Sequence, residues 1–115
     1  MTRTLLTPVG LRTLSPHNPD YHSLYRGDQH ERDAAYHQGI VWVWLIGAYV
    51  DAYLKVYADH APLRALFDSI RARLTDAGIG TLGEIFEAEP PYRSVGCLAQ
   101  AWSVAEVLRA YRRLQ

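Results

Sequence analysis

Residues 36–47 of this 115-residue chain read YHQGIVWVWLIG, and the apolar segment that begins there continues to residue 57. Between residues 40 and 57 the only charged side chains are Asp51 and Lys55, and there is no proline. A surface helix should carry one apolar stripe with a polar face opposite. This segment is apolar on nearly every side, so we expect a buried helix over residues 38–57 that the rest of the chain must cover.

Two further helices are predicted after it. Pro62 follows Asp59 and His60, a pattern typical of a helix start, and we expect a helix over residues 62–76. Its apolar face would comprise Leu63, Leu66, Phe67, Ile70 and Leu74. A third helix is expected over residues 99–113, with Ala101, Val104, Ala105, Leu108 and Tyr111 facing inward. The sequence therefore predicts an all-α fold of about three helices and long loops.

The N-terminal third is rich in turn-forming residues. Residues 1–35 contain Pro, Gly, Asp and Asn in clusters such as SPHNPD at 15–20. We interpret residues 1–35 as a long ordered loop that leads into the helices, with a short strand near residues 4–7. Residues 79–98 are also predicted to be irregular, because they contain Gly80, Gly83, Gly96 and a Pro-Pro pair.

Composition narrows the class of protein. The chain is 49% hydrophobic and carries no net charge, which favours a globular protein and argues against a nucleic-acid or anionic membrane partner. One cysteine, Cys97, excludes an internal disulfide, and the histidines lack ligand spacing, so we expect no metal and no cofactor. No secretory signal follows Met1, and the uncharged run is shorter than the roughly 18 residues a membrane span needs. We expect a cytoplasmic protein in a single region.

The order of the helices has a geometric consequence. If three consecutive helices pack up, down and up, the N-terminal ends of the first and third lie together. The two segments richest in polar and aromatic side chains, residues 36–44 and 84–102, sit at or before those ends. Helix N-termini present free N–H groups, so we expect both segments to converge on one site.

The segment GEIFEAEPPY at 83–92 contains three carboxylates, Glu84, Glu87 and Glu89. Glycoside hydrolysis with inversion uses two carboxyl groups about 6.5–9.5 Å apart, one as acid and one as a base that activates water. Glu84 could serve as one member of such a pair. The other interpretation is that all three are solvated loop acids.

Aromatic rings among amide, imidazole and carboxylate side chains are the mixture that sugar sites use, because flat rings stack on pyranose faces. The chain supplies this mixture in Tyr36, His37, Gln38, Trp42, Trp44, Gln100 and Trp102. For any single tryptophan, a place in the core is the simpler interpretation. The polar His37 and Gln38 beside an apolar segment are harder to explain by packing.

Several of these motifs together resemble the C-terminal part of glycogen debranching enzymes, their amylo-α-1,6-glucosidase module. The matching motifs are GLRTLSP at 10–16, YHQG at 36–39, VWVW at 41–44, EIF at 84–86, PP at 90–91, GC at 96–97 and AQAWS at 99–103. They occur in one order from about residue 5 to residue 111. This order makes the resemblance more specific than any one motif.

The resemblance implies an (α/α)6 barrel, of which this chain would be the C-terminal portion. It implies inverting hydrolysis of α-1,6-linked glucose in glycogen or another branched α-glucan. Glu84 would be the general base, and the general acid would lie on a part of the barrel outside this chain, so the isolated chain should be inactive. The residues that the resemblance places near the sugar are Tyr36, His37, Gln38, Trp42, Gln100 and Trp102. The remainder of the barrel would be the chain's structural partner.

Three other interpretations stay open on the sequence. The chain could be a non-catalytic glucan-binding module that uses the same tryptophan and glutamine residues. It could be a subunit that completes a barrel with a separately encoded partner. It could also be a related (α/α)6 glycosidase, trehalase-like or glucoamylase-like.

Overall fold

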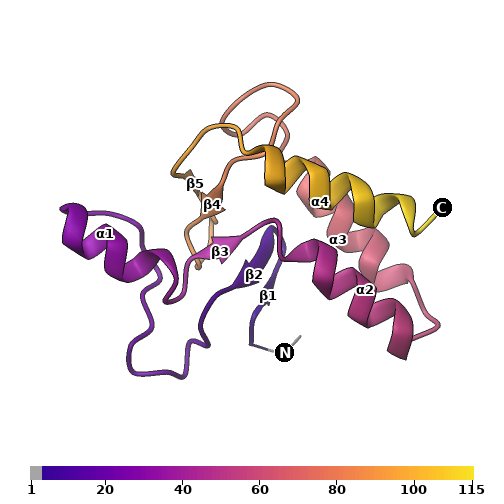
Figure 1. Ribbon diagram of the computed structural model, residues 1–115, viewed down its shortest axis with the longest axis horizontal. Coiled ribbons are helices and arrows are strands. Elements are labelled where there is room, and N and C mark those ends of the chain that lie inside the picture. The colour runs from indigo at the N-terminus through magenta and orange to yellow at the C-terminus, as the bar shows by residue number, and fades with distance from the viewer. Residues whose placement is uncertain (1–3) are drawn as a thin grey trace.

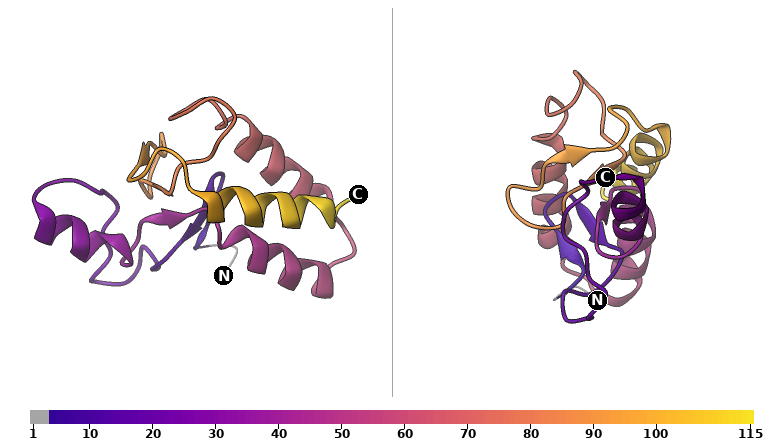
Figure 2. Two further views of the ribbon diagram at one scale, coloured as in Figure 1. Left: turned by 45° about the horizontal axis from the view of Figure 1, so that its top comes forward. Right: turned by 90° about the vertical axis from the view of Figure 1, so that its left-hand side faces the viewer.

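The computed structural model describes residues 4–115, which combine four helices with a five-stranded antiparallel sheet (Figure 1). The strands are β1 (Leu6–Thr7), β2 (Gly10–Arg12), β3 (Val41–Trp42), β4 (Ile85–Phe86) and β5 (Ser94–Val95), and they lie in this order across the sheet. The helices are α1 (Gln29–Tyr36), α2 (Ile46–Val56), α3 (Ala61–Arg71) and α4 (Ala101–Arg112). Helices α2, α3 and α4 lie at one end of the molecule and α1 at the other (Figures 1 and 2).

The all-α prediction, and with it the portion of an (α/α)6 barrel, is wrong for this structure, because the fold is mixed and is built on a sheet. The error begins in the first predicted helix, since α2 starts only at Ile46 and residues 41–42 form the central strand. Valine and tryptophan favour strands, and a short run buried on both faces cannot be told from a buried helix by periodicity. Residues 38–45 belong to the turns and strand before α2.

Strand β3 separates two apolar clusters because its side chains alternate between the faces of the sheet. Val41 and Val43 belong to the main core, which α2, α3 and α4 cover. Trp42 lies on the other face, opposite Ile85 of β4. We call this second group the tryptophan cluster; its buried members are Ala35, Ile40, Trp42 and Ile85, and Tyr25, Tyr36, Trp44, Leu45 and Val95 pack against them.

The prediction of one long loop over residues 1–35 is wrong for residues 4–35, which contain two strands and most of a helix. Residues 1–3 lie outside the described residues. The short strand expected near residues 4–7 is present as β1, and β2 pairs with it. Helix α1 begins after Asp28, whose side chain accepts a hydrogen bond from the Glu31 N–H while the Glu31 carboxylate accepts one from the Asp28 N–H. This D-x-x-E capping box is a sequence signal that could have revealed α1.

The second predicted helix is confirmed as α3, with Pro62 in its first turn and a buried face of Leu63, Leu66, Phe67 and Ile70. It ends at Arg71, five residues earlier than expected. The third is confirmed as α4, but its inward face is not the predicted one. Leu108 and Tyr111 are exposed and border an apolar groove of about 840 Å³ between α3 and α4.

The parallel alignment of the first and third predicted helices is confirmed by the contacts between α2 and α4. Asp51 of α2 forms ion pairs of 2.9 Å with Arg109 of α4 and with Arg113, the residue that follows α4. Near the N-termini, Gly47 leaves room for the Glu106 carboxylate, which a β-carbon would displace. The two N-termini therefore lie at the same end of the pair. No helix in residues 4–115 is long and apolar enough to cross a membrane.

Candidate functional site

Glu84 lies directly before β4 and is bound on both sides of its carboxylate. Its Oε1 accepts a hydrogen bond from the Tyr36 hydroxyl, and its Oε2 accepts one of 3.1 Å from the Cys97 N–H. The Glu84 N–H donates in turn to the Cys97 carbonyl oxygen at 3.0 Å. The last residue of α1 and the loop after β5 thus fix one half-buried carboxylate between them.

The backbone at Gly96 allows this approach. Gly96 has a φ of +73°, and a β-carbon there would lie 2.6 Å from Glu84 Oε2 and 3.0 Å from Ile85 Cγ1. Glycine adopts the left-handed conformation without steric penalty and leaves the space open. Glycine is therefore needed at position 96 for two reasons: its φ is positive, and the Glu84 carboxylate lies where a β-carbon would be.

Tyr36 is a donor that keeps its proton. Burial, and then the hydrogen bond to Glu84, raise the pKa of the Tyr36 hydroxyl well above its usual range. The Trp42 indole N–H donates to the Tyr36 carbonyl oxygen at 2.8 Å, and the two rings meet edge to face with centroids 4.8 Å apart. Trp42 therefore holds Tyr36 in the position from which it contacts Glu84.

His37 is exposed and covers the tryptophan. Its ring stacks on Trp42 at 5.3 Å with an interplanar angle of 5°, and it meets the edge of Tyr36 at 4.8 Å. Trp42 itself is only 7% exposed. Of the predicted residues, Tyr36 contacts Glu84 directly, and His37 and Trp42 pack against Tyr36, with Trp42 beneath the surface as a support.

The other predicted sugar-contacting residues lie elsewhere. The Gln38 side chain is exposed, and its backbone joins α1 to the preceding loop through Ala35 and His22. Gln100 precedes α4, where its N–H donates to the Leu82 carbonyl oxygen at 2.9 Å. Trp102 lies in the first turn of α4 and is 52% exposed.

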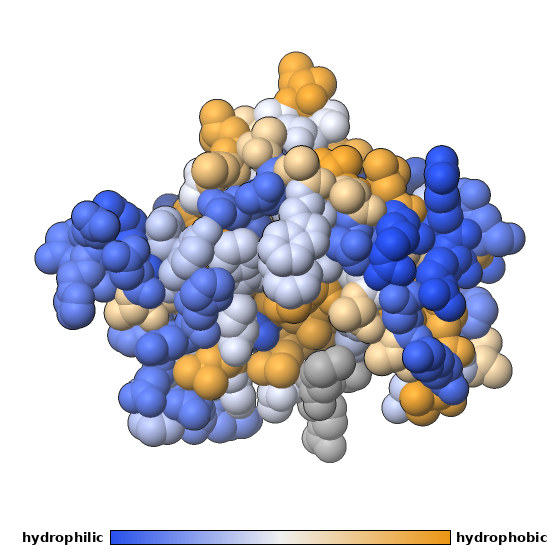
Figure 3. Space-filling model, in the orientation of Figure 1, coloured by the Kyte–Doolittle hydropathy of each residue, from blue (hydrophilic) through white to orange (hydrophobic). Residues whose placement is uncertain are grey.

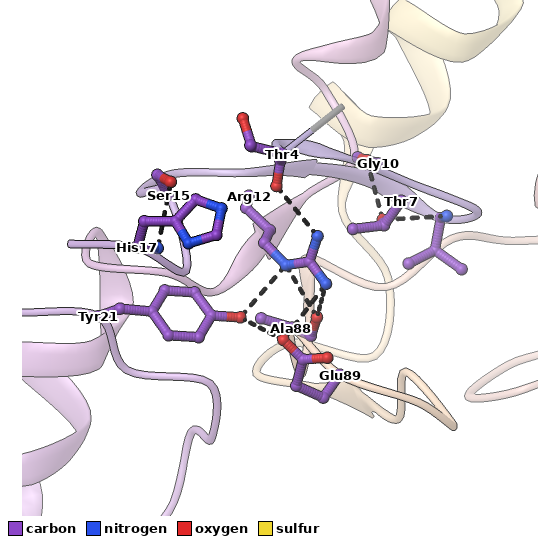
Figure 4. A network of polar contacts seen from close by, with 10 residues as sticks. Thr4, Thr7, Gly10, Arg12, Ser15, His17, Tyr21, Ala88 and Glu89 are labelled. Atoms are coloured by element: carbon purple, nitrogen blue, oxygen red, sulfur yellow. Dashed lines mark hydrogen bonds and ion pairs between the residues drawn. The ribbon is translucent and has the colours of Figure 1, made fainter. Parts of the chain in front are cut away.

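The three carboxylates of residues 84–89 have different surroundings, so they are not uniformly solvated. Glu87 is buried and forms a 3.3 Å ion pair with Arg26. Glu89 accepts a 2.7 Å hydrogen bond from the Tyr21 hydroxyl and a 3.3 Å contact from Arg12, whose guanidinium also donates to the Ala88 carbonyl (Figure 4). Among the described residues, Glu84 is the one of the three that has neutral donors and no cation.

Two contributors to the surroundings of Glu84 were not predicted as site residues, Gly96 and Cys97. Both follow β5, and only the pairing of β4 with β5 brings them to Glu84. No sequence signal at Cys97 could have indicated a role for its backbone N–H. Within residues 4–115 there is no group of three or more His, Cys, Asp or Glu side chains that could hold a metal ion.

Comparisons with known proteins give one consistent result. The sequence model of the amylo-alpha-1,6-glucosidase family matches residues 1–109. The glycogen debranching enzyme of Saccharomyces cerevisiae is 40% identical to the chain over 61 residues. This alignment covers 48% of the chain and 4% of the length of the yeast enzyme.

Proposed function

Because the chain belongs to the amylo-alpha-1,6-glucosidase family, we propose that it contributes to hydrolysis of α-1,6-linked glucose at branch points of glycogen or another branched α-glucan. Glu84 is the general base of an inverting mechanism in this proposal. Tyr36 and His37 border the sugar, and Trp42 supports them from below. The hydrogen bonds that hold Glu84 and Tyr36 in place support this assignment.

The observation that carries this assignment is the difference between Glu84 and its two acidic neighbours. A general base must be able to take a proton from water, and a carboxylate that is bound by a guanidinium already uses an oxygen in an ion pair. Glu87 and Glu89 have such cations, whereas Glu84 is held by the Tyr36 hydroxyl and the Cys97 N–H. Within residues 4–115, Glu84 is thus fixed in position without being paired to a positive charge.

In the proposed step, Glu84 takes a proton from a water molecule as the water oxygen forms a bond to the anomeric carbon. The bond to the leaving oxygen breaks on the opposite face, and a second carboxyl group protonates that oxygen. Glu87 and Glu89 are engaged in ion pairs, so this acid is proposed to lie outside residues 1–115. The isolated chain should therefore release no glucose from a branched limit dextrin.

The test uses a protein that contains this chain and releases glucose. Glu84→Gln should lower kcat by about 10²–10⁴-fold, because the amide cannot accept the proton from water. Glu89→Gln, an identical chemical change five residues away, is the control and should leave kcat within about twofold. Proton NMR of the first product should show β-glucose. Unchanged kcat in Glu84→Gln, or α-glucose as first product, would overturn the assignment.

A non-catalytic glucan-binding module is the second candidate function. The exposed ring of Trp102 favours it, because a binding surface needs an accessible aromatic face and no base. In that case the isolated chain should bind a glucan equally well with Glu84 or with Gln at this position, and no protein containing it should lose hydrolysis on that change.

A further inference from the structure

Helix α1 is held in place chiefly at its C-terminal end. Ala35 is the only buried residue of the helix, and the surface over α1 in Figure 3 is hydrophilic. Tyr36, whose hydroxyl donates to Glu84, is the last residue of α1. The position of Tyr36 therefore depends on residues 37–40, which join α1 to β3 and which we call the α1–β3 turn.

The hydroxyl of Thr13 holds this turn. Thr13 follows β2, and its Oγ1 accepts a 2.9 Å hydrogen bond from the Gly39 N–H and donates one of 3.1 Å to the Ile40 carbonyl oxygen. The Thr13 N–H donates to the same carbonyl oxygen at 3.2 Å. One half-buried side chain thus pairs with a donor and an acceptor of the α1–β3 turn.

A second segment of the chain also holds the turn. The His22 N–H donates to the Gln38 carbonyl oxygen at 2.7 Å. Gly39 is buried and has a φ of +142°, and a β-carbon there would collide with the His22 carbonyl oxygen. The turn therefore has little room to shift while Thr13 and His22 remain in place.

The residues on both sides of the α1–β3 turn support Glu84. Trp42 of β3 donates through its indole N–H to the Tyr36 carbonyl oxygen, and the Tyr36 hydroxyl donates to Glu84. Only five residues separate Tyr36 from Trp42, so a shift of the turn moves one ring against the other. Among the described residues Thr13 forms no hydrogen bond with Glu84, so any effect of Thr13 on this carboxylate passes through the turn.

Thr7 forms the same kind of hydrogen bonds at another turn. Its hydroxyl donates to the Gly10 carbonyl oxygen at 2.9 Å and accepts a 3.3 Å hydrogen bond from the Val9 N–H. These contacts hold the turn between β1 and β2, and β1 lies at the edge of the sheet, with β2 and β3 between it and β4. Thr7 and Thr13 therefore share their hydrogen bonding but differ in location, which makes Thr7 a control for a general contribution to folding.

We propose that Thr13 is a positioning residue, whose hydroxyl fixes the α1–β3 turn and so keeps the Tyr36 hydroxyl on Glu84. Its effect on catalysis rests on the proposed function, in which Glu84 is the base. Displacement of a reacting group by about 1 Å can cost on the order of 10²-fold in rate, so loss of the Thr13 hydroxyl should act on turnover. Valine has nearly the shape of threonine, but it leaves the Gly39 N–H without its acceptor.

The first test uses a protein that contains this chain and releases glucose. Thr13→Val should lower kcat on the order of tenfold, because Glu84 loses its fixed position. Thr13→Ser, which restores the hydroxyl, should recover most of kcat. Thr7→Val is the matched control and should leave kcat unchanged.

A second measurement does not depend on hydrolysis. In the 115-residue chain with a carbon-13 label at the tyrosine ζ-carbon, the Tyr36 NMR signal is the one missing from Tyr36→Phe. Thr13→Val should move this signal, because the hydrogen bond from Tyr36 to Glu84 is weakened, and Thr7→Val should leave it in place. Thr13→Cys, whose thiol is a weaker donor and acceptor, should move the signal less and replaces the valine variant if that variant does not fold.

A moved Tyr36 signal, together with a lower kcat that Thr13→Ser restores, supports the positioning role. An unmoved signal in Thr13→Val overturns it, even where kcat falls, and so does an equal movement in Thr7→Val. An unchanged kcat in Thr13→Val, in a protein whose kcat Glu84→Gln lowers, overturns the effect on catalysis. If Glu84→Gln leaves kcat unchanged, the proposed function fails, while a moved signal still supports the action of Thr13 on Tyr36.

Discussion

Two places in this molecule join a tyrosine hydroxyl to a glutamate, and they differ in one respect. Tyr21 donates to Glu89 beside Arg12, whereas Tyr36 donates to Glu84, which has no cation partner in the part of the chain that the structure describes. Arg12 also donates to the backbone at Ala88 and Thr4, so its network ties three segments together (Figure 4). Glu84 also joins three segments, through Tyr36 at the end of α1 and Cys97 after β5, but both of its contacts are with neutral donors. One carboxylate is thus engaged by a cation, while the other is held by neutral donors alone among the described residues.

The largest effect is expected at the structural pair. Arg12→Ala should lower the free energy of unfolding by about 3 kcal/mol, because it leaves the buried Ala88 carbonyl without its donor. The Arg12 side chain is 11% exposed and that of Glu89 is 46% exposed, so most of the loss comes from the backbone contacts and not from the ion pair. Urea denaturation gives the value.

The control for that change is Arg112→Ala. Arg112 is exposed on α4 and forms no ion pair among the described residues. Its replacement should therefore change the free energy of unfolding by no more than about 0.5 kcal/mol. Equal destabilisation by the two substitutions would contradict the structural role assigned to Arg12.

A smaller effect is expected beside Glu84. Gly96→Ala should lower the free energy of unfolding by about 2 kcal/mol, since a left-handed alanine is strained and its β-carbon displaces the Glu84 carboxylate. Gly80→Ala is a matched control, because Gly80 has a φ of +74° and a β-carbon there would have no neighbour within 4 Å. The difference between the two variants in urea denaturation isolates the contact with Glu84. A difference of zero would mean that Glu84 is free to move away.

The smallest effect concerns pH. Burial, with the hydrogen bond to Glu89, raises the pKa of Tyr21 to about 12, while Arg12 opposes that rise. Burial and the hydrogen bond to Glu84 also raise the pKa of Tyr36. The folded chain therefore holds these protons more tightly than the unfolded chain, whose tyrosines titrate near about pH 10. Stability should be unaffected below about pH 10 and should fall between about pH 10 and 12.

Tyr21→Phe and Tyr36→Phe should each make that fall in stability less steep, as measured by urea denaturation at several pH values. Arg12→Met should raise the pKa of Tyr21 further, because the opposing positive charge is lost. The pKa of Tyr36 should stay unchanged. Tyrosinate absorbance measures both. An equal response of the two tyrosines would mean that the cation does not distinguish the pairs.

The family could be identified from the sequence before the structure was known. The order of the motifs indicated the family that the comparison over residues 1–109 supports. The amphipathic pattern of α3, the position of α4 and the meeting of the α2 and α4 N-termini were also predictable, because they depend on local sequence and chain order. The D-x-x-E capping box of α1 was readable at residues 28–31, although the prediction missed it.

Tertiary structure decided the rest. Residues 41–42 form a strand because β2 and β4 pair with them on both sides, and neither partner is adjacent in the sequence. The same pairing buries Trp42, which lies beneath His37, while Trp102 on α4 stacks on Trp44 and stays exposed. The sequence alone established residue types and their order. Which carboxylate received a cation depended on contacts between distant segments, which no local pattern records.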